Sequence, residues 1–133
     1  MATGASNIED VVRAHDLIKN NNDDLILLQC NTNYENKKSN FNHLNLNVLN
    51  YYSIRFPGII LGLSDHTKNH VSTLGAIALG AKVIEKHFTD DDTRQGPDHS
   101  FALTPGQWVE MMDRSRELEA SLGLPEKNIE DNE

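Results

Sequence analysis

The chain has 133 residues, a net charge of −8 and ordinary shares of apolar and charged residues, which is typical of one globular domain. Its 12 Lys and Arg residues are dispersed, which excludes the concentrated basic patch that proteins use to bind nucleic acid or an anionic membrane surface. No apolar stretch approaches the roughly 20 residues of a membrane-spanning helix, and the single Cys30 cannot form an internal disulfide, so we expect a cytoplasmic protein.

The first two predicted elements are a helix and a buried strand. Ser6-Asn7-Ile8-Glu9 has the pattern of a capping box, in which the serine and glutamate side chains satisfy free amides at a helix start. The helix is expected to end in the polar run 19–24, and the continuously apolar segment 25–30 predicts a parallel strand covered on both faces. The residues before the helix, Met1-Ala2-Thr3-Gly4, resemble the end of another strand.

The later elements continue this alternation of helix and strand. An asparagine-rich segment without apolar periodicity, 31–42, reads as a loop at the carboxyl end of the first strand. Apolar spacing then predicts a helix at 44–54, a strand at 59–63, a helix at 71–79, a strand around 83–84 and a helix at 104–122. The last helix begins at Thr104-Pro105-Gly106-Gln107, where threonine and glutamine complete a capping box around a proline in the first turn.

This element order predicts an α/β fold built from parallel crossovers. It supplies only three full strands, whereas an eight-stranded (β/α)8 barrel typically needs about 250 residues. We therefore expect residues 1–123 to form part of a larger fold, and the charged residues 124–133 to be a truncated linker segment.

Two polar clusters, each with one histidine, close two of the predicted strands. Gly62-Leu63-Ser64-Asp65-His66-Thr67 ends one strand and Glu85-Lys86-His87-Phe88-Thr89 ends the next. Carboxyl ends of neighbouring parallel strands meet at one edge of the sheet, where α/β folds place their ligands. We therefore expect His66 and His87 to lie close enough to share a divalent metal ion, with Asp65 and Glu85 orienting the imidazoles or balancing the charge.

Two other features of this region leave alternatives open. His66 and His70 are four residues apart and form a rival ligand pair if the segment between them is helical. In Gly96-Pro97-Asp98-His99, the turn either presents Asp98 to the strand ends or is an exposed turn before the last helix.

Together, these motifs resemble the sialic acid synthase family. The strand-end motifs at 62–67 and 85–89, the small-residue segment Leu74-Gly75-Ala76-Ile77-Ala78-Leu79-Gly80-Ala81 and the turn at 96–99 occur in the family's order. This family comprises N-acetylneuraminate synthases and relatives that make legionaminic acid, pseudaminic acid and spore-coat sugars. The resemblance implies the carboxyl-terminal part of a (β/α)8 barrel, roughly its last three strand–helix units.

The resemblance also implies a reaction: phosphoenolpyruvate condenses with an N-acetylated hexosamine, water adds and inorganic phosphate leaves. A divalent ion, Mn²⁺ or Mg²⁺, polarises the aldehyde of the open-chain sugar in this family. By residue match, His66 and His87 would be the metal ligands and act catalytically through the ion. The substrate-binding residues implied in the same way are Ser64, Thr32, Tyr34 and Asp98.

Two positions, Gln29 and Glu35, depart from the histidine and proline usual in the family, and the barrel's first half, which supplies phosphate-binding lysines, is not matched. Catalysis is therefore expected only within a complete barrel, formed with a complementing half-barrel chain or in a homodimer. The alternative function is a non-catalytic fragment or association module from a split or decayed synthase gene, whose open strand edges pair with another chain. A third option is a related synthase that acts on a different aldose.

Overall fold

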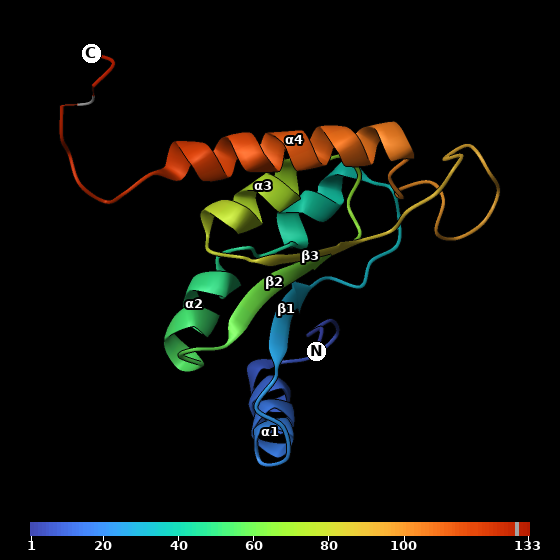
Figure 1. Ribbon diagram of the computed structural model, residues 1–133. Helices are drawn as coiled ribbons and strands as arrows, with labels where there is room; N and C mark the ends of the chain where they lie inside the picture. The colour runs from blue at the N-terminus through green and yellow to red at the C-terminus, as the bar shows by residue number, and fades with distance from the viewer. Residues whose placement is uncertain (130) are drawn as a thin grey trace.

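The computed structural model describes residues 1–129 and 131–133, and in this part of the chain one three-stranded parallel sheet carries helices between its strands (Figure 1). The elements in chain order are α1 (Ile8–Lys19), β1 (Ile26–Cys30), the 3-10 helix η1 (Lys38–His43), α2 (Val48–Arg55), β2 (Ile60–Asp65), α3 (Val71–Ala78), β3 (Val83–Lys86) and α4 (Pro105–Leu122). Each strand predicted from apolar runs is present. No helix in residues 1–129 and 131–133 combines the length and apolar character that crossing a bilayer requires.

The strands lie in sequential order, β1-β2-β3, and the helices pack on one face of the sheet. Figure 1 shows them following one another around the sheet, with α1 at the bottom, α2 at the left and α3 beneath α4 at the top. The main core forms on this helix-covered face from apolar strand residues and apolar helix residues: Val11, Leu27, Leu49, Tyr52, Phe56, Leu61, Leu63, Ala76 and Ala81. Because doubly wound sheets carry helices on both faces, this arrangement is an arc of a barrel.

The opposite face of the sheet, which we call the open face, carries the alternate strand residues. The register pairs Cys30 with Ser64 and Ser64 with Glu85, so these three side chains form a row across that face. Nearer the amino ends of the strands, Ile26 and Ile60 are 38% and 50% exposed. The open face is therefore polar toward the carboxyl ends of the strands and apolar toward their amino ends.

The first residues of the chain lie beside β1 as a further parallel segment. Thr3 donates its N–H to the Leu28 carbonyl at 3.0 Å, and Leu28 donates to the Met1 carbonyl at 2.9 Å. This pairing agrees with the predicted strand end. The capping box of α1 lies one residue later than predicted: Asn7 is the N-cap and exchanges side-chain and backbone bonds with Asp10, while Ser6 donates to Gly4 instead.

Two segments between β1 and β2 differ from the prediction. The expected loop contains η1, and α2 begins at Val48 rather than at residue 44. Asn45 explains the later start, because its φ of 48° lies in the left-handed region, which interrupts a helix and which asparagine tolerates better than most residues. After α4, residues 123–129 and 131–133 contain no helix or strand, and Glu130 of the predicted linker lies outside the described residues.

Gly62 in β2 lies where β1, β2 and β3 are too closely packed for a larger side chain. A Cβ at this position would overlap the carbonyl oxygen of Val83 and a methyl group of Leu28. We expect Gly62→Ala to push β2 and β3 apart and to lower the free energy of unfolding by about 1–3 kcal/mol, measured by urea denaturation. Gly106→Ala is the matched control, because a Cβ there meets nothing within 4 Å; equal loss in both variants would contradict the packing explanation.

Candidate functional site

His66 and His87 directly follow β2 and β3, and the structure brings their rings together. Asp65 and Lys86 are paired in register, so the next residue of each strand continues side by side on the open face. The ring centroids are 5.2 Å apart and the ring planes are inclined by 64°. Two imidazoles from adjacent strand ends thus lie close together at the edge of the sheet where barrels bind their ligands.

A backbone hydrogen bond orients the ring of His66. Its Nδ1 lies 2.8 Å from the carbonyl oxygen of Asn31, at the carboxyl end of β1. Because a carbonyl only accepts, Nδ1 carries the proton and the lone pair of the neutral ring is at Nε2. Burial lowers the pKa of His66; the Asn31 carbonyl opposes this shift and the neighbouring His87 adds to it. The neutral, metal-binding form is therefore favoured.

Aromatic rings surround the two imidazoles. Tyr34 lies 4.4 Å from His66 and 5.5 Å from His87, between ring centroids, and its side chain is half-exposed. Phe101, which the sequence analysis did not identify, lies 4.9 Å from His87 and 6.1 Å from His66. It lies far from the strand ends along the chain, in a segment without periodicity, so no local sequence signal indicated it.

The two carboxylates beside the histidines have different environments, which corrects the expectation that both serve the imidazoles. Asp65 is the last residue of β2 and points to the helix-covered face, where its side chain is buried in an ion pair with Lys86 at 2.7 Å. The prediction ended this strand at residue 63, and two more strand residues decide the direction of Asp65. Glu85 is exposed on the open face and is the carboxylate that shares a face with His66 and His87.

Glu85 is hydrogen-bonded to Ser64, the predicted phosphoenolpyruvate contact. The Ser64 hydroxyl donates to Oε1 of Glu85 at 2.6 Å and is buried. On the other side of Ser64 lies Cys30, whose thiol pKa is raised by burial although a hydrogen bond with Ser64 opposes the shift. A protonated, buried thiol is typical of a cysteine that packs in the structure and does not react.

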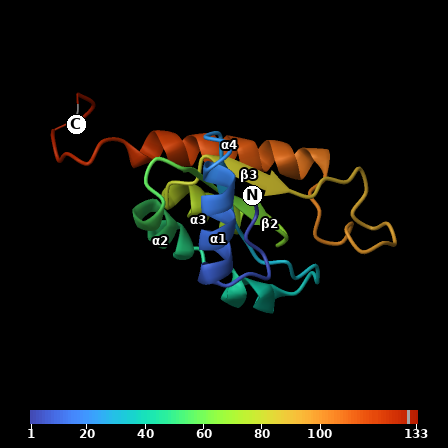
Figure 2. The ribbon, with the colours of Figure 1, turned by 90° about the horizontal axis from the view of Figure 1, so that it is seen from below.

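The other predicted site residues lie at the rim. Thr32 is exposed and packs against Gly4, and Asp98 is exposed in the loop between β3 and α4, with no side-chain hydrogen bond or ion pair within residues 1–129 and 131–133. That loop projects beyond the carboxyl end of β3 in both views (Figures 1 and 2). Residues 66–70 are not helical, so their spacing does not place His70 beside His66 as the rival pair requires.

The donor set suits a metal ion that completes its coordination with other oxygen ligands. In the described part of the chain, no three His, Cys, Asp or Glu side chains form a group that could hold an ion, so this chain offers the two imidazoles alone. The geometry around His66 fits such a role, because metal-binding histidines typically donate their other N–H to a carbonyl or carboxylate, as His66 does to Asn31. Two protein ligands leave most positions for water and substrate, which is typical of a catalytic site.

Parallel strands in sequential order, helices on one face and a ring cluster at the carboxyl ends define this chain as an arc of a (β/α)8 barrel. The family profile of NeuB matches residues 1–127, and the chain belongs to the NeuB family. Human N-acetylneuraminate-9-phosphate synthase is 33% identical over 129 residues, which are 97% of this chain and 35% of the relative. N,N'-diacetyllegionaminic acid synthase of Legionella pneumophila is 33% identical over 138 residues, covering 100% of this chain and 38% of the relative.

Solved structures give the same result. N-acetylneuraminic acid synthetase from Leptospira borgpetersenii, crystallised with citrate, superposes with a TM-score of 0.87 at 25% identity, over 98% of this chain and 45% of that one. Spore coat polysaccharide biosynthesis protein SpsE from Bacillus subtilis gives a TM-score of 0.81 at 35% identity, over 97% of this chain and 36% of that one. These comparisons confirm the predicted family and the partial barrel. The chain spans between 35% and 38% of the length of the human and Legionella synthases.

Proposed function

We propose that the chain supplies the metal-binding edge of a synthase that condenses phosphoenolpyruvate with an N-acetylated hexosamine to give a nonulosonic acid and phosphate. The observation that carries the proposal is the His66–His87 ring pair at 5.2 Å, located where barrel enzymes bind substrate, in a chain of the NeuB family. Relatives named as sialic, legionaminic and pseudaminic acid synthases support the general reaction.

In this proposal, a divalent ion, Mn²⁺ or Mg²⁺, held by His66 and His87 would polarise the sugar aldehyde as a Lewis acid. The Asn31 carbonyl holds the His66 ring with Nε2 free, so the ligand atom is pre-oriented. Tyr34, which is half-exposed and whose ring is tilted against that of His66, forms a wall for the acceptor sugar, while Thr32 and Asp98 at the rim contact substrate groups.

Charge at the site explains why a complete barrel is needed. Lys86 is buried against Asp65, and Lys68 is paired with Asp92 at 2.7 Å, so neither is free to bind the phosphate of phosphoenolpyruvate. In this arrangement the Ser64 hydroxyl donates its single proton to Glu85 and supplies no donor to the phosphate. The cationic groups that an anionic substrate requires then come from the rest of the barrel.

The test is a fusion of this chain to the part of Bacillus subtilis SpsE that lies amino-terminal to its matching segment. SpsE is suited because it is 37% identical to the chain over 123 residues. We expect phosphate release from phosphoenolpyruvate that depends on Mn²⁺ or Mg²⁺ and on an N-acetylated hexosamine, measured over a panel of phosphorylated and unphosphorylated sugars. A folded fusion that binds the metal but releases no phosphate with any sugar would contradict the proposal.

A second candidate, a non-catalytic association module, is favoured by the apolar part of the open face, where Ile26 and Ile60 are exposed. Such a module would pair with a complementing half-barrel chain or with a second copy without restoring turnover. Light scattering on the chain alone and with the separate SpsE portion reports whether a complex forms, and phosphate release reports whether it is active. A stable complex without activity supports the association module over the synthase.

A further inference from the structure

Phe101 is a fully buried ring that lies outside the main core. Its side chain is 1% exposed, yet it does not belong to the apolar cluster between sheet and helices in residues 1–129. Its aromatic neighbours are instead His87, His66 and Tyr34, at 4.9, 6.1 and 5.6 Å between ring centroids. The burial of this large ring therefore serves the candidate site and not the core of the arc.

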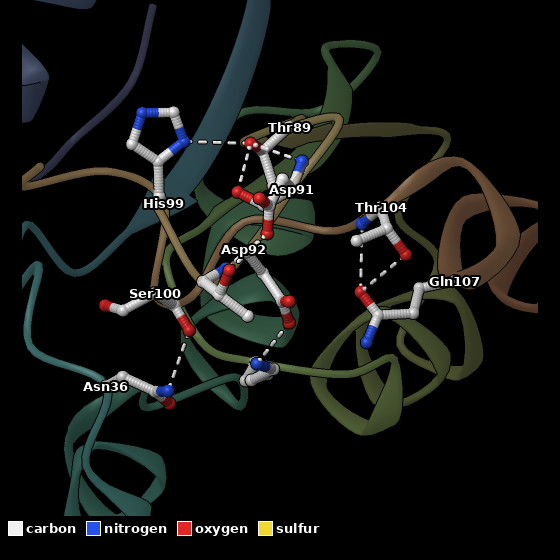
Figure 3. A network of polar contacts seen from close by, with 10 residues as sticks. Asn36, Thr89, Asp91, Asp92, His99, Ser100, Thr104 and Gln107 are labelled. Carbon is white, nitrogen blue, oxygen red and sulfur yellow. Dashed lines mark hydrogen bonds and ion pairs between the residues drawn. The ribbon is translucent and has the colours of Figure 1, made fainter. Parts of the chain in front are cut away.

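The backbone on both sides of Phe101 is fixed to the strand-end segments. Leu103 donates its N–H to the carbonyl of His87 at 2.9 Å, and Thr89 donates to the carbonyl of Leu103 at 3.0 Å. On the other side, the Asn36 side-chain amide donates to the carbonyl of Ser100 at 2.7 Å (Figure 3). Phe101 is thus held between the end of β3 and the loop that follows β1.

The loop before Phe101 has further anchors. Lys68, two residues after His66, forms an ion pair with Asp92 at 2.7 Å, and both side chains are partly buried. The Thr89 hydroxyl lies 2.8 Å from Nδ1 of His99, on the opposite side of the same loop (Figure 3). Segments after all three strands therefore contribute to the position of the ring.

His87 depends on this packing more than His66 does. His66 is oriented by its hydrogen bond to Asn31, whereas within the described residues the ring of His87 has no hydrogen bond. Three rings contact it, and of these Phe101 is the nearest, at 4.9 Å, and the most deeply buried. Tyr34 is 46% exposed and lies farther from the imidazole, at 5.5 Å, so it constrains that ring less than Phe101 does.

We propose that Phe101 is a positioning residue that fixes the tilt of the His87 imidazole and its separation from His66. The proposal rests on the proposed function in taking these two rings as metal ligands. Aromatic pairs prefer defined tilted or edge-to-face arrangements, so a buried, anchored ring selects one orientation of its neighbour. Without Phe101, the His87 side chain would sample several rotamers. The ion would then have to order His87 when it binds, which costs binding free energy.

The experiment measures binding of Co²⁺ and Mn²⁺ to the chain by calorimetry, together with the visible spectrum of the Co²⁺ complex. Phe101→Ala is expected to weaken binding by about 10- to 100-fold, as loss of groups that orient metal ligands does, and to alter the Co²⁺ spectrum. Phe101→Leu, which restores apolar volume, should recover part of the affinity. Asn36→Ala, an exposed substitution that removes only the Ser100 anchor, should weaken binding to a smaller extent.

Phe56→Ala is the matched control, because it truncates an equally large buried ring in the main core, which is not part of the ring cluster around His66 and His87. It should lower the melting temperature while the folded protein keeps its metal affinity and Co²⁺ spectrum. Wild-type affinity and spectrum in folded Phe101→Ala would overturn the proposal; if that variant does not fold, wild-type values in both Phe101→Leu and Asn36→Ala would do so.

A measurement without metal separates this inference from the proposed function. Carbon relaxation of the imidazoles reports ring mobility, and Asn36→Ala and Phe101→Leu should increase the mobility of His87 more than that of His66. Failure of the wild-type chain to bind either ion would contradict the metal role, while the positioning role would still be decided by these relaxation data. Unchanged mobility of His87 in both variants would overturn it.

Discussion

His66→Ala is expected to abolish metal-dependent turnover in the completed barrel while the fold is retained. The substitution removes one of the two imidazoles that this chain offers to an ion, and it leaves the Asn31 carbonyl without its donor. Changes to groups that merely orient metal ligands cost about 10- to 100-fold, so loss of a ligand should cost at least about 100-fold in metal affinity. The measurements are phosphate release by the SpsE fusion and Mn²⁺ binding by the chain.

His70→Ala provides the control within the same loop. His70 precedes α3 and makes no side-chain capping bond to that helix, and it does not take part in the ring cluster around His66. We expect turnover and metal affinity close to those of the unsubstituted protein. Full turnover of the His66→Ala fusion at trace metal would exclude His66 as a ligand, and an equal loss in His70→Ala would attribute the effect to the loop instead.

The strands and the meeting of the two histidines could be predicted because both follow from local patterns. Continuous apolar runs identified the parallel strands. Because a polar cluster with one histidine closes each of two neighbouring strands, His66 and His87 were expected at the same edge of the sheet. The order of strands and helices then limited the topology to parallel crossovers. The function came from the resemblance of whole motifs, since the residues alone indicated only two imidazoles beside polar groups.

The direction of Asp65 could not be predicted, because it depends on where β2 ends. Side chains alternate along a strand, so extending β2 from the predicted residue 63 to Asp65 places this carboxylate on the face opposite to His66. Its partner Lys86 is 21 residues away, and their pairing needs the register between β2 and β3. Register is a tertiary property that apolar periodicity does not contain.

Phe101 escaped prediction for a related reason. The bridge between Phe88 and Leu103 and the bond from Asn36 to Ser100 join segments up to 64 residues apart. Neither contact has a local signature, and the segment between β3 and α4 lacks periodicity. The late start of α2 likewise depends on the left-handed backbone conformation of Asn45. Many asparagines do not adopt this conformation, so the residue type alone did not indicate it.

Lys86→Met is expected to cause a large loss of stability. The side chains of Lys86 and Asp65 are 1% and 0% exposed, and their charged groups lie 2.7 Å apart. Burial lowers the pKa of Lys86, and the adjacent carboxylate opposes this shift. Removing the ammonium group leaves a buried carboxylate without its counter-charge, which typically costs about 3–5 kcal/mol. For a chain of this size, that loss corresponds to a decrease in melting temperature on the order of 10 °C, measured by circular dichroism.

Asp65 also accepts hydrogen bonds from the hydroxyl groups of Thr67 and Ser72, so its carboxylate stays partly satisfied in Lys86→Met. The reverse change, Asp65→Asn, should therefore be at least as damaging, because it weakens these bonds as well as removing the counter-charge of Lys86. Lys82→Met controls for loss of a lysine, since Lys82 is exposed just before β3 and should melt within a degree or two of the unsubstituted chain. A Lys86→Met variant with an unchanged melting temperature would show that water reaches the pair and that Asp65 does not depend on it.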